Sequence, residues 1–138
     1  LGVLRLRLAA EPALDIADEG PPLGSRVSVS TSGDTALTLA VFSSEGCGLC
    51  RALDPVVAAF RRDPLVTLAE FDTAVGKVGV VICYDRHFPE IWRELAIPGS
   101  PYAVALDNDG HVRAKGTFNS YGQLESILAT AERSLASA

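Results

Sequence analysis

Residues 35–60 read TALTLAVFSSEGCGLCRALDPVVAAF, an apolar run that leads into two cysteines and then into a helical pattern. The apolar run at 35–42 predicts a strand that is buried on both faces. The helical pattern comes from apolar residues that recur every three or four positions, Leu53, Val56, Val57 and Phe60. Cys47 and Cys50 are therefore predicted to lie where a buried strand meets the amino end of a helix.

This position favours thiol–disulfide chemistry at Cys47 and Cys50. A helix N-terminus presents unpaired N–H groups and a partial positive charge, which favour the thiolate over the thiol at Cys47. The two-residue spacer lets the second sulfur attack a mixed disulfide formed at the first. We therefore predict a redox pair with Cys47 as nucleophile and Cys50 as resolving cysteine.

Two other interpretations of the cysteine pair stay open. A zinc site needs two further ligands at suitable spacing, and Cys83, His87 and His111 are the remaining cysteine and histidine residues. Cys83 and His87 fall on a strand-like run and its exit, which is unlike a zinc knuckle. A purely structural disulfide is the second alternative. The redox interpretation requires neither a metal nor a cofactor.

Composition predicts one folded domain without affinity for nucleic acid. The chain has 138 residues, of which 48% are hydrophobic and 21% charged, as in ordinary globular proteins. The formal net charge is −5, and the basic residues are scattered. An acidic chain without a basic stripe is poorly suited to bind nucleic acid or anionic lipid.

Residues 1–25 are interpreted as an extended lead-in. The segment 9–25 is rich in Ala, Glu, Asp, Pro and Gly, which favours an unpacked conformation. Residues 1–8 alternate apolar and basic side chains, consistent with an edge strand or with the stub that follows a membrane anchor. No apolar run of the length needed to cross a bilayer is present. We expect the chain to be a piece of a longer protein.

The remaining pattern alternates strands and helices and ends in a hairpin and a helix. Asp107-Asn-Asp-Gly110 is a strong turn signal, and Ser120 with Gln123 matches a helix capping box. We expect strands at 26–30, 65–71, 102–106 and 111–116, and helices at 88–96 and after Ser120. This order predicts an α/β fold with a mixed central sheet and helices on both sides.

These features together resemble the thioredoxin-like fold family. The matching residues are the Cys47–Cys50 motif after a buried strand, Pro55 in the following helix, and Ser100-Pro101 before the hairpin. The resemblance implies a three-layer α/β/α sandwich over 26–138 that acts on protein thiols or disulfides. It also implies that Pro101 contacts the cysteine pair and that Ser100 offers backbone groups to an extended substrate.

A narrower resemblance concerns residues 97–116. This segment is similar to the methylamine-utilisation and cytochrome-biogenesis branch of membrane-anchored thioredoxin-like proteins, and the lead-in resembles the segment that follows the anchor helix there. The resemblance implies a monomer outside the cytoplasm, held at the membrane by a tether absent from this sequence.

Two departures from the thioredoxin pattern keep a redox-inactive binding module open as an alternative. Gly46 stands where thioredoxins usually carry Trp, and residues 35–42 contain no buried acid. Proton transfer to Cys50 would then depend on Glu45, Glu70 or water. An unperturbed Cys47 thiol would favour the binding module, and a clearly more acidic one would favour the enzyme.

Residues 76–96, GKVGVVICYDRHFPEIWRELA, resemble a different family. They are similar to the nucleophile segment of nitrilases, or carbon–nitrogen hydrolases, in which Cys83 would be the nucleophile. That family also uses a Glu base and a Lys from well upstream, whereas Lys77 is only six positions before Cys83. We interpret about 73–90 as an atypical insert whose run 78–82 forms an extra strand and buries Cys83. A nitrilase-type amidase is the third hypothesis.

Overall fold

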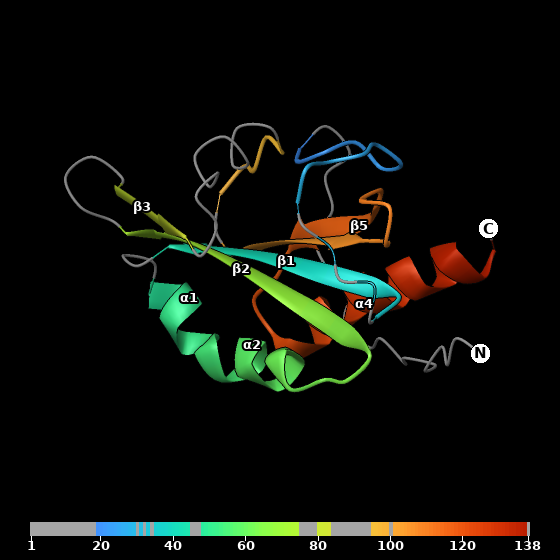
Figure 1. Cartoon of the computed structure of the whole chain (residues 1–138). Coiled ribbons are helices and arrows are strands. Elements are labelled where there is room, and N and C mark those ends of the chain that lie inside the picture. The colour runs from blue at the N-terminus through green and yellow to red at the C-terminus, as the bar shows by residue number, and fades with distance from the viewer. Residues whose placement is uncertain are drawn as a thin grey trace.

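The computed structural model describes residues 19–29, 31, 33, 35–44, 48–74, 80–83, 95–99 and 101–137. Five strands form one mixed sheet in the order β3-β2-β1-β4-β5 (Figure 1). Their bounds are β1 Leu37–Ser44, β2 Val66–Ala74, β3 Val80–Cys83, β4 Tyr102–Leu106 and β5 Val112–Thr117. The predicted α/β class with a mixed central sheet is confirmed.

Strand β1 lies at the centre of the sheet. It pairs in parallel with β2 and antiparallel with β4, so that Phe42 lies between Phe71 and Tyr102. The side chains of residues 37–42 are all buried, which confirms the prediction of a strand covered on both faces. This burial explains the near-continuous apolar run, because a strand between two cores has no solvent-facing side.

The two faces of the sheet bury different cores. The first core joins the sheet to the helices and includes Leu37, Leu39, Val41, Val57, Phe60, Leu124, Ile127 and Leu128. The second core lies on the other face and consists of Val27, Val29, Ala40, Phe42, Leu95, Ile97, Tyr102, Val104, Leu106 and Val112. Alternate residues of β1 and β4 belong to opposite cores, as the two-residue period of a strand requires.

The helix after the cysteines is interrupted as Pro55 predicted. Helix α1 (Gly48–Ala52) and helix α2 (Asp54–Arg61) meet at Leu53. Leu53 donates its N–H to the Leu49 carbonyl at 3.0 Å and accepts one from Val57 at 3.0 Å, so helical hydrogen bonding continues across the junction. Pro55 has no N–H to donate, and its ring is tolerated here because it stands in the first turn of α2.

Helix α4 (Tyr121–Ala136) begins at the predicted capping box. The Gln123 N–H donates to Ser120 Oγ at 3.1 Å, while Gln123 Oε1 accepts the Asn119 N–H at 2.7 Å. These bonds satisfy donors that the first helical turn would otherwise leave unpaired. The apolar stripe of α4 packs on the first core, as its spacing predicted.

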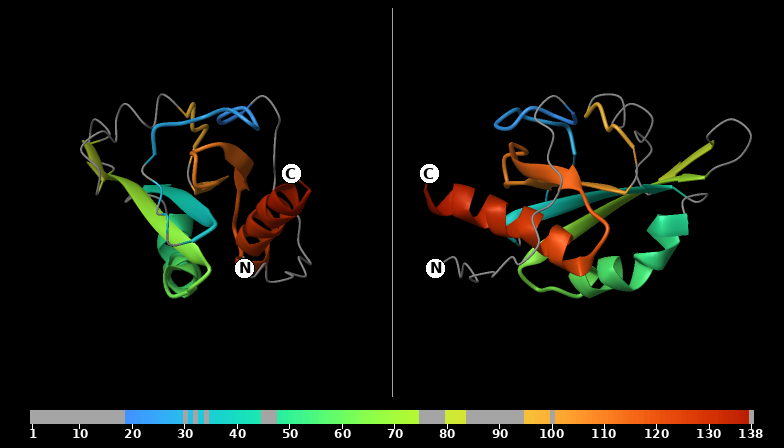
Figure 2. Two further views of the ribbon diagram at one scale, coloured as in Figure 1. Left: turned by 45° about the vertical axis from the view of Figure 1, so that its right-hand side comes forward. Right: turned by 180° about the vertical axis from the view of Figure 1, so that it is seen from behind.

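Residues 19–29, here called the strap, cross the second core and follow the edge of β5 (Figure 2). Gly24 donates its N–H to the Val112 carbonyl at 2.8 Å, and Val112 donates to the Ser25 carbonyl at 2.9 Å. Val27 and Val29 contribute side chains to the second core. The prediction of a strand at 26–30 is wrong, because the described part of that segment forms only an isolated bridge between Arg26 and His111.

Strand β3 extends the sheet beyond β2. It pairs antiparallel with β2, from Phe71 opposite Cys83 to Ala74 opposite Val80. This confirms the extra strand expected near 78–82, with its carboxyl end at Cys83. The predicted helix at 88–96 lies mostly outside the described residues, but Leu95 and Ala96 form a turn, so the helix does not reach Ala96. Ala96 has a φ of 51°, a left-handed conformation that helix interiors do not use.

Candidate functional site

Cys50 lies on helix α1, none of whose residues is buried. The Cys50 side chain is half-buried. Leu49 beside it is 45% exposed, and a Cβ added at Gly48 would have no neighbour within 4 Å. The described part of the cysteine motif is therefore accessible from solvent. Cys47 lies outside the described residues.

Pro101 lies just before the start of β4. It is buried and immediately precedes Tyr102, the first residue of β4, which is the register partner of Phe42 on β1. Since β1 and β4 are antiparallel, the start of β4 lies beside the end of β1, from which the chain continues to Cys47. Pro101 thus lies beside the carboxyl end of β1, and its contact with Cys47 and Cys50 stays a prediction. Ser100 lies outside the described residues.

Val41 and Glu70 are register partners on β1 and β2. Val41 is apolar and buried, so this position of β1 supplies no carboxyl group. Glu70 accepts hydrogen bonds on both carboxylate oxygens from Arg61, at 2.9 Å from Nε and also from Nη2. Of the candidates for proton transfer to Cys50, Glu70 is therefore already bound by a guanidinium group, and Glu45 lies outside the described residues.

Cys83 lies on a different strand from the cysteine motif. It is the register partner of Phe71 on β2, which in turn is the partner of Phe42 on β1. With about 4.8 Å between neighbouring strands, two strand spacings separate the Cys83 backbone from β1, roughly 10 Å. The zinc alternative with Cys83 and His87 stays untested, because Cys47 and His87 lie outside the described residues.

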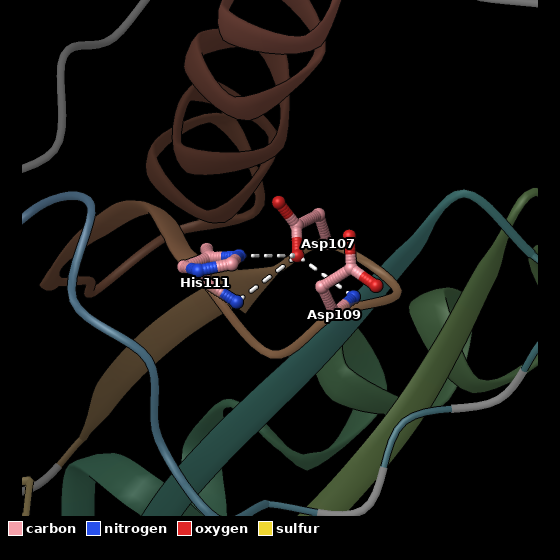
Figure 3. A group of neighbouring side chains, drawn as sticks. All are labelled: Asp107, Asp109 and His111. Atoms are coloured by element: carbon pink, nitrogen blue, oxygen red, sulfur yellow. Dashed lines mark hydrogen bonds and ion pairs between the residues drawn. The ribbon is translucent and has the colours of Figure 1, made fainter.

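A polar cluster at the β4–β5 hairpin was not predicted as such from the sequence (Figure 3). Asp107 Oδ1 accepts the backbone N–H of Asp109 at 2.9 Å and that of His111 at 3.0 Å, and Asp107 Oδ2 accepts Arg113 Nε at 2.8 Å. Ligand atoms of Asp107, Asp109 and His111 lie within 4.8 Å of one another. Because Asp107 Oδ1 accepts two backbone N–H groups of the hairpin and Oδ2 accepts Arg113 of β5, we assign this cluster a structural role.

The Asp107 carboxyl group ionises more readily than usual. Burial raises its pKa, but hydrogen bonds from the His111 backbone, the Arg113 side chain and the Asp109 backbone, together with the Arg113 charge, outweigh burial and hold the pKa of Asp107 below 3.8. A lowered pKa means that the folded state favours the carboxylate. The stabilisation is therefore complete above the unfolded-state pKa and is lost as the pH falls through the folded-state pKa.

Asp107→Asn is expected to lower the free energy of unfolding by about 1–2 kcal/mol at pH 7, because charge-assisted hydrogen bonds are lost. The difference from the original chain should shrink at a strongly acidic pH below the folded-state pKa, where the carboxylate is protonated in both states. Urea unfolding at both pH values measures this, with the exposed Asp109→Asn as control. An equal difference at both pH values would contradict the assignment.

Only helices among the described residues can be assessed for their ability to span a membrane. None of their helices combines the length and the apolar character needed to span a bilayer.

Comparison of the sequence with known proteins identifies a hydrolase family. The family model described as carbon–nitrogen hydrolase matches residues 36–124, more than half of the chain. A similar curated protein is apolipoprotein N-acyltransferase from Nostoc sp. (strain PCC 7120), which is 38% identical over 53 residues. That match covers 38% of this chain and 11% of the relative.

Comparison of the structure identifies a fold. A mutant thioredoxin from Halobacterium salinarum NRC-1 superposes with a TM-score of 0.52 at 19% identity, covering 72% of this chain and 78% of that one. Spinach chloroplast thioredoxin f gives a TM-score of 0.53 at 20% identity, covering 74% and 75%. The thioredoxin of Wuchereria bancrofti gives 0.51 at 15% identity, covering 77% and 84%. By the extent of its sequence match the chain belongs to the carbon–nitrogen hydrolase family, and its described residues adopt a thioredoxin-like fold.

Proposed function

We propose that this protein is a thiol–disulfide oxidoreductase that acts on protein disulfides through Cys47 and Cys50. The observation that supports this most directly is the topology around β1. Its carboxyl end leads into the Cys47–Cys50 motif and an interrupted helix, and the start of β4 at Pro101 lies alongside. The thioredoxin-like fold of the described residues agrees with this reaction type.

The proposed reaction transfers two electrons from the dithiol to a substrate disulfide. The Cys47 thiolate attacks one substrate sulfur, so that a mixed disulfide forms and the other substrate sulfur leaves as a thiolate, which takes up a proton. The Cys50 thiol then loses its proton and attacks the Cys47 sulfur. This step releases the second substrate thiol and leaves the Cys47–Cys50 disulfide. An external dithiol returns the pair to its reduced state.

The whole chain is expected to catalyse the reduction of insulin disulfides by dithiothreitol, measured as the turbidity of the released B chain. The expected result is a rate that rises in proportion to protein concentration above the background rate of dithiothreitol. A rate equal to the background would refute the oxidoreductase proposal and favour the redox-inactive binding module.

The resemblance to membrane-anchored thioredoxin-like proteins also suggests the substrate and the location of this protein. We propose that the substrate is a protein outside the cytoplasm, bound as an extended segment beside Pro101, and that the protein works as a monomer. Main-chain hydrogen bonds to an extended segment would give affinity with little dependence on sequence.

The family match supports a second candidate function, acyl transfer or amide hydrolysis at Cys83. The match at 36–124 includes Cys83 at the end of β3. In this reaction the Cys83 thiolate would attack a carbonyl carbon and expel the amine as its leaving group, and water or a second nucleophile would then release the acyl group. Ammonia release from simple aliphatic amides, compared with Cys83→Ala, tests it. Turnover that depends on Cys83 would support this candidate over the first.

A further inference from the structure

Two buried side chains point at one backbone oxygen of the strap. Lys115 Nζ donates to the Glu19 carbonyl oxygen at 2.6 Å, and the Tyr102 hydroxyl donates to the same oxygen at 3.4 Å. Tyr102 is 2% exposed and Lys115 is 3% exposed. Breaking a hydrogen bond to a buried ammonium or hydroxyl group is costly, so both bonds favour a strap that stays in place.

The strap also lies close against Tyr102 at Gly20. Gly20 has a φ of 71°, and a Cβ added to it would lie 2.2 Å from the Tyr102 hydroxyl oxygen and 2.8 Å from its Cζ. No side chain fits in this space without displacing either the strap or the tyrosine ring. Glycine is therefore required at this position both for its conformation and for its lack of a side chain.

The contact lies next to Pro101, beside which the substrate is proposed to bind. Tyr102 directly follows Pro101 and begins β4, and Lys115 is the register partner of Val104 two residues further along β4. Farther along the strap, the Val27 N–H donates to the Gly110 carbonyl at 2.9 Å, and Arg26 Nε donates to the Asp109 carbonyl at 3.0 Å. The strap is thus attached at both ends of the β4–β5 hairpin, and its Glu19 end is the one beside Pro101.

We propose that Tyr102 and Lys115 are positioning residues, which hold the Glu19 end of the strap and thereby fix the start of β4 at Pro101. This inference rests on the proposed oxidoreductase function, because the Pro101 segment matters only if a substrate binds beside it. Displacing the strap at Gly20 would loosen the Pro101 segment, beside which a protein substrate is proposed to bind, without altering the cysteines.

The test compares two glycines of the strap that both have a left-handed backbone. Gly20→Ala introduces a Cβ against Tyr102, whereas Gly24→Ala, at a φ of 84°, introduces one with no neighbour within 4 Å. In insulin reduction, Gly20→Ala should raise KM about fivefold with kcat within about twofold, while Gly24→Ala should leave KM near its original value. Equal KM values in the two variants would overturn the proposal.

Tyr102→Phe supplies a partial rescue, because it removes the atom closest to the added Cβ but leaves Cζ 2.8 Å from it. Tyr102→Phe alone should raise KM about two- to threefold, and combining it with Gly20→Ala should raise KM by less than the product of the two single effects. Additive effects would contradict a shared contact.

Hydrogen exchange separates this inference from the proposed function. Amides of residues 102–106 should exchange faster in Gly20→Ala than in Gly24→Ala, whether or not insulin is reduced. Faster exchange without insulin reduction in the original chain would retain the strap contact and remove the oxidoreductase function. Unchanged exchange with normal reduction would remove the positioning role alone.

Discussion

Cys47→Ser is expected to lower the rate of insulin reduction by at least about 1,000-fold, to the background rate of dithiothreitol, because the attacking thiolate is lost. Cys50→Ser should lower steady turnover by about 100-fold or more but leave the first attack intact. The Cys50→Ser variant should therefore accumulate a mixed disulfide between Cys47 and the substrate, which mass spectrometry detects as an adduct that dithiothreitol removes.

Cys83→Ser is the matched control for both variants, because it removes the same thiol group from β3, two strands away from β1. Its rate of insulin reduction should stay within about twofold of the original rate. A loss of turnover in Cys83→Ser comparable to that in Cys47→Ser would refute the assignment of the redox pair. An adduct on Cys83 in the Cys50→Ser variant would do the same.

Phe60→Ala is expected to lower the free energy of unfolding by about 3–5 kcal/mol, the usual cost of removing a buried aromatic ring. Phe60 is 1% exposed in the first core, on the last turn of α2. Its ring stacks on that of Tyr121 with a centroid distance of 4.9 Å, so it joins α2 to the start of α4. Urea unfolding followed by circular dichroism measures the change.

Tyr121→Leu tests the same stacked pair from its exposed side. Tyr121 is 45% exposed, so this variant should cost about 1 kcal/mol, mostly the aromatic contact itself. The two costs should differ by at least about 2 kcal/mol. Similar costs would show that the stacked pair, and not the buried volume of Phe60, accounts for the stabilisation.

The hydrolase family match at 36–124 spans all five strands, and the described part of the segment that resembles a hydrolase nucleophile region includes β3. Strand β3 extends the sheet at the outer side of β2, through a connection of five residues, 75–79. An antiparallel hairpin at a sheet edge adds a strand without altering the pairing of β1, β2, β4 and β5. The addition of β3 therefore need not disturb the strand pairing at the centre of the sheet.

The candidate site could be predicted from sequence only where the signal is local. The interrupted helix at Pro55 and the turn at 107–110 each owe their structure to neighbours within a few residues, and both formed as predicted. The contact of Tyr102 and Lys115 with Glu19 joins residues more than 80 positions apart, and no local pattern encodes it. The prolines and glycines at 20–24 led to the prediction of an unpacked segment. These residue types indicate how stiff the backbone is, but not whether the segment packs against the sheet.

The sequence by itself determined the central strand, the interrupted helix and the capped closing helix, since hydrophobic period, proline geometry and capping are local physical effects. The tertiary structure alone decided that the strap covers the second core, that Arg61 forms an ion pair with Glu70, and that β3 pairs antiparallel with the outer side of β2. These contacts depend on which surfaces remain uncovered after the sheet has formed, and that is a property of the assembled chain.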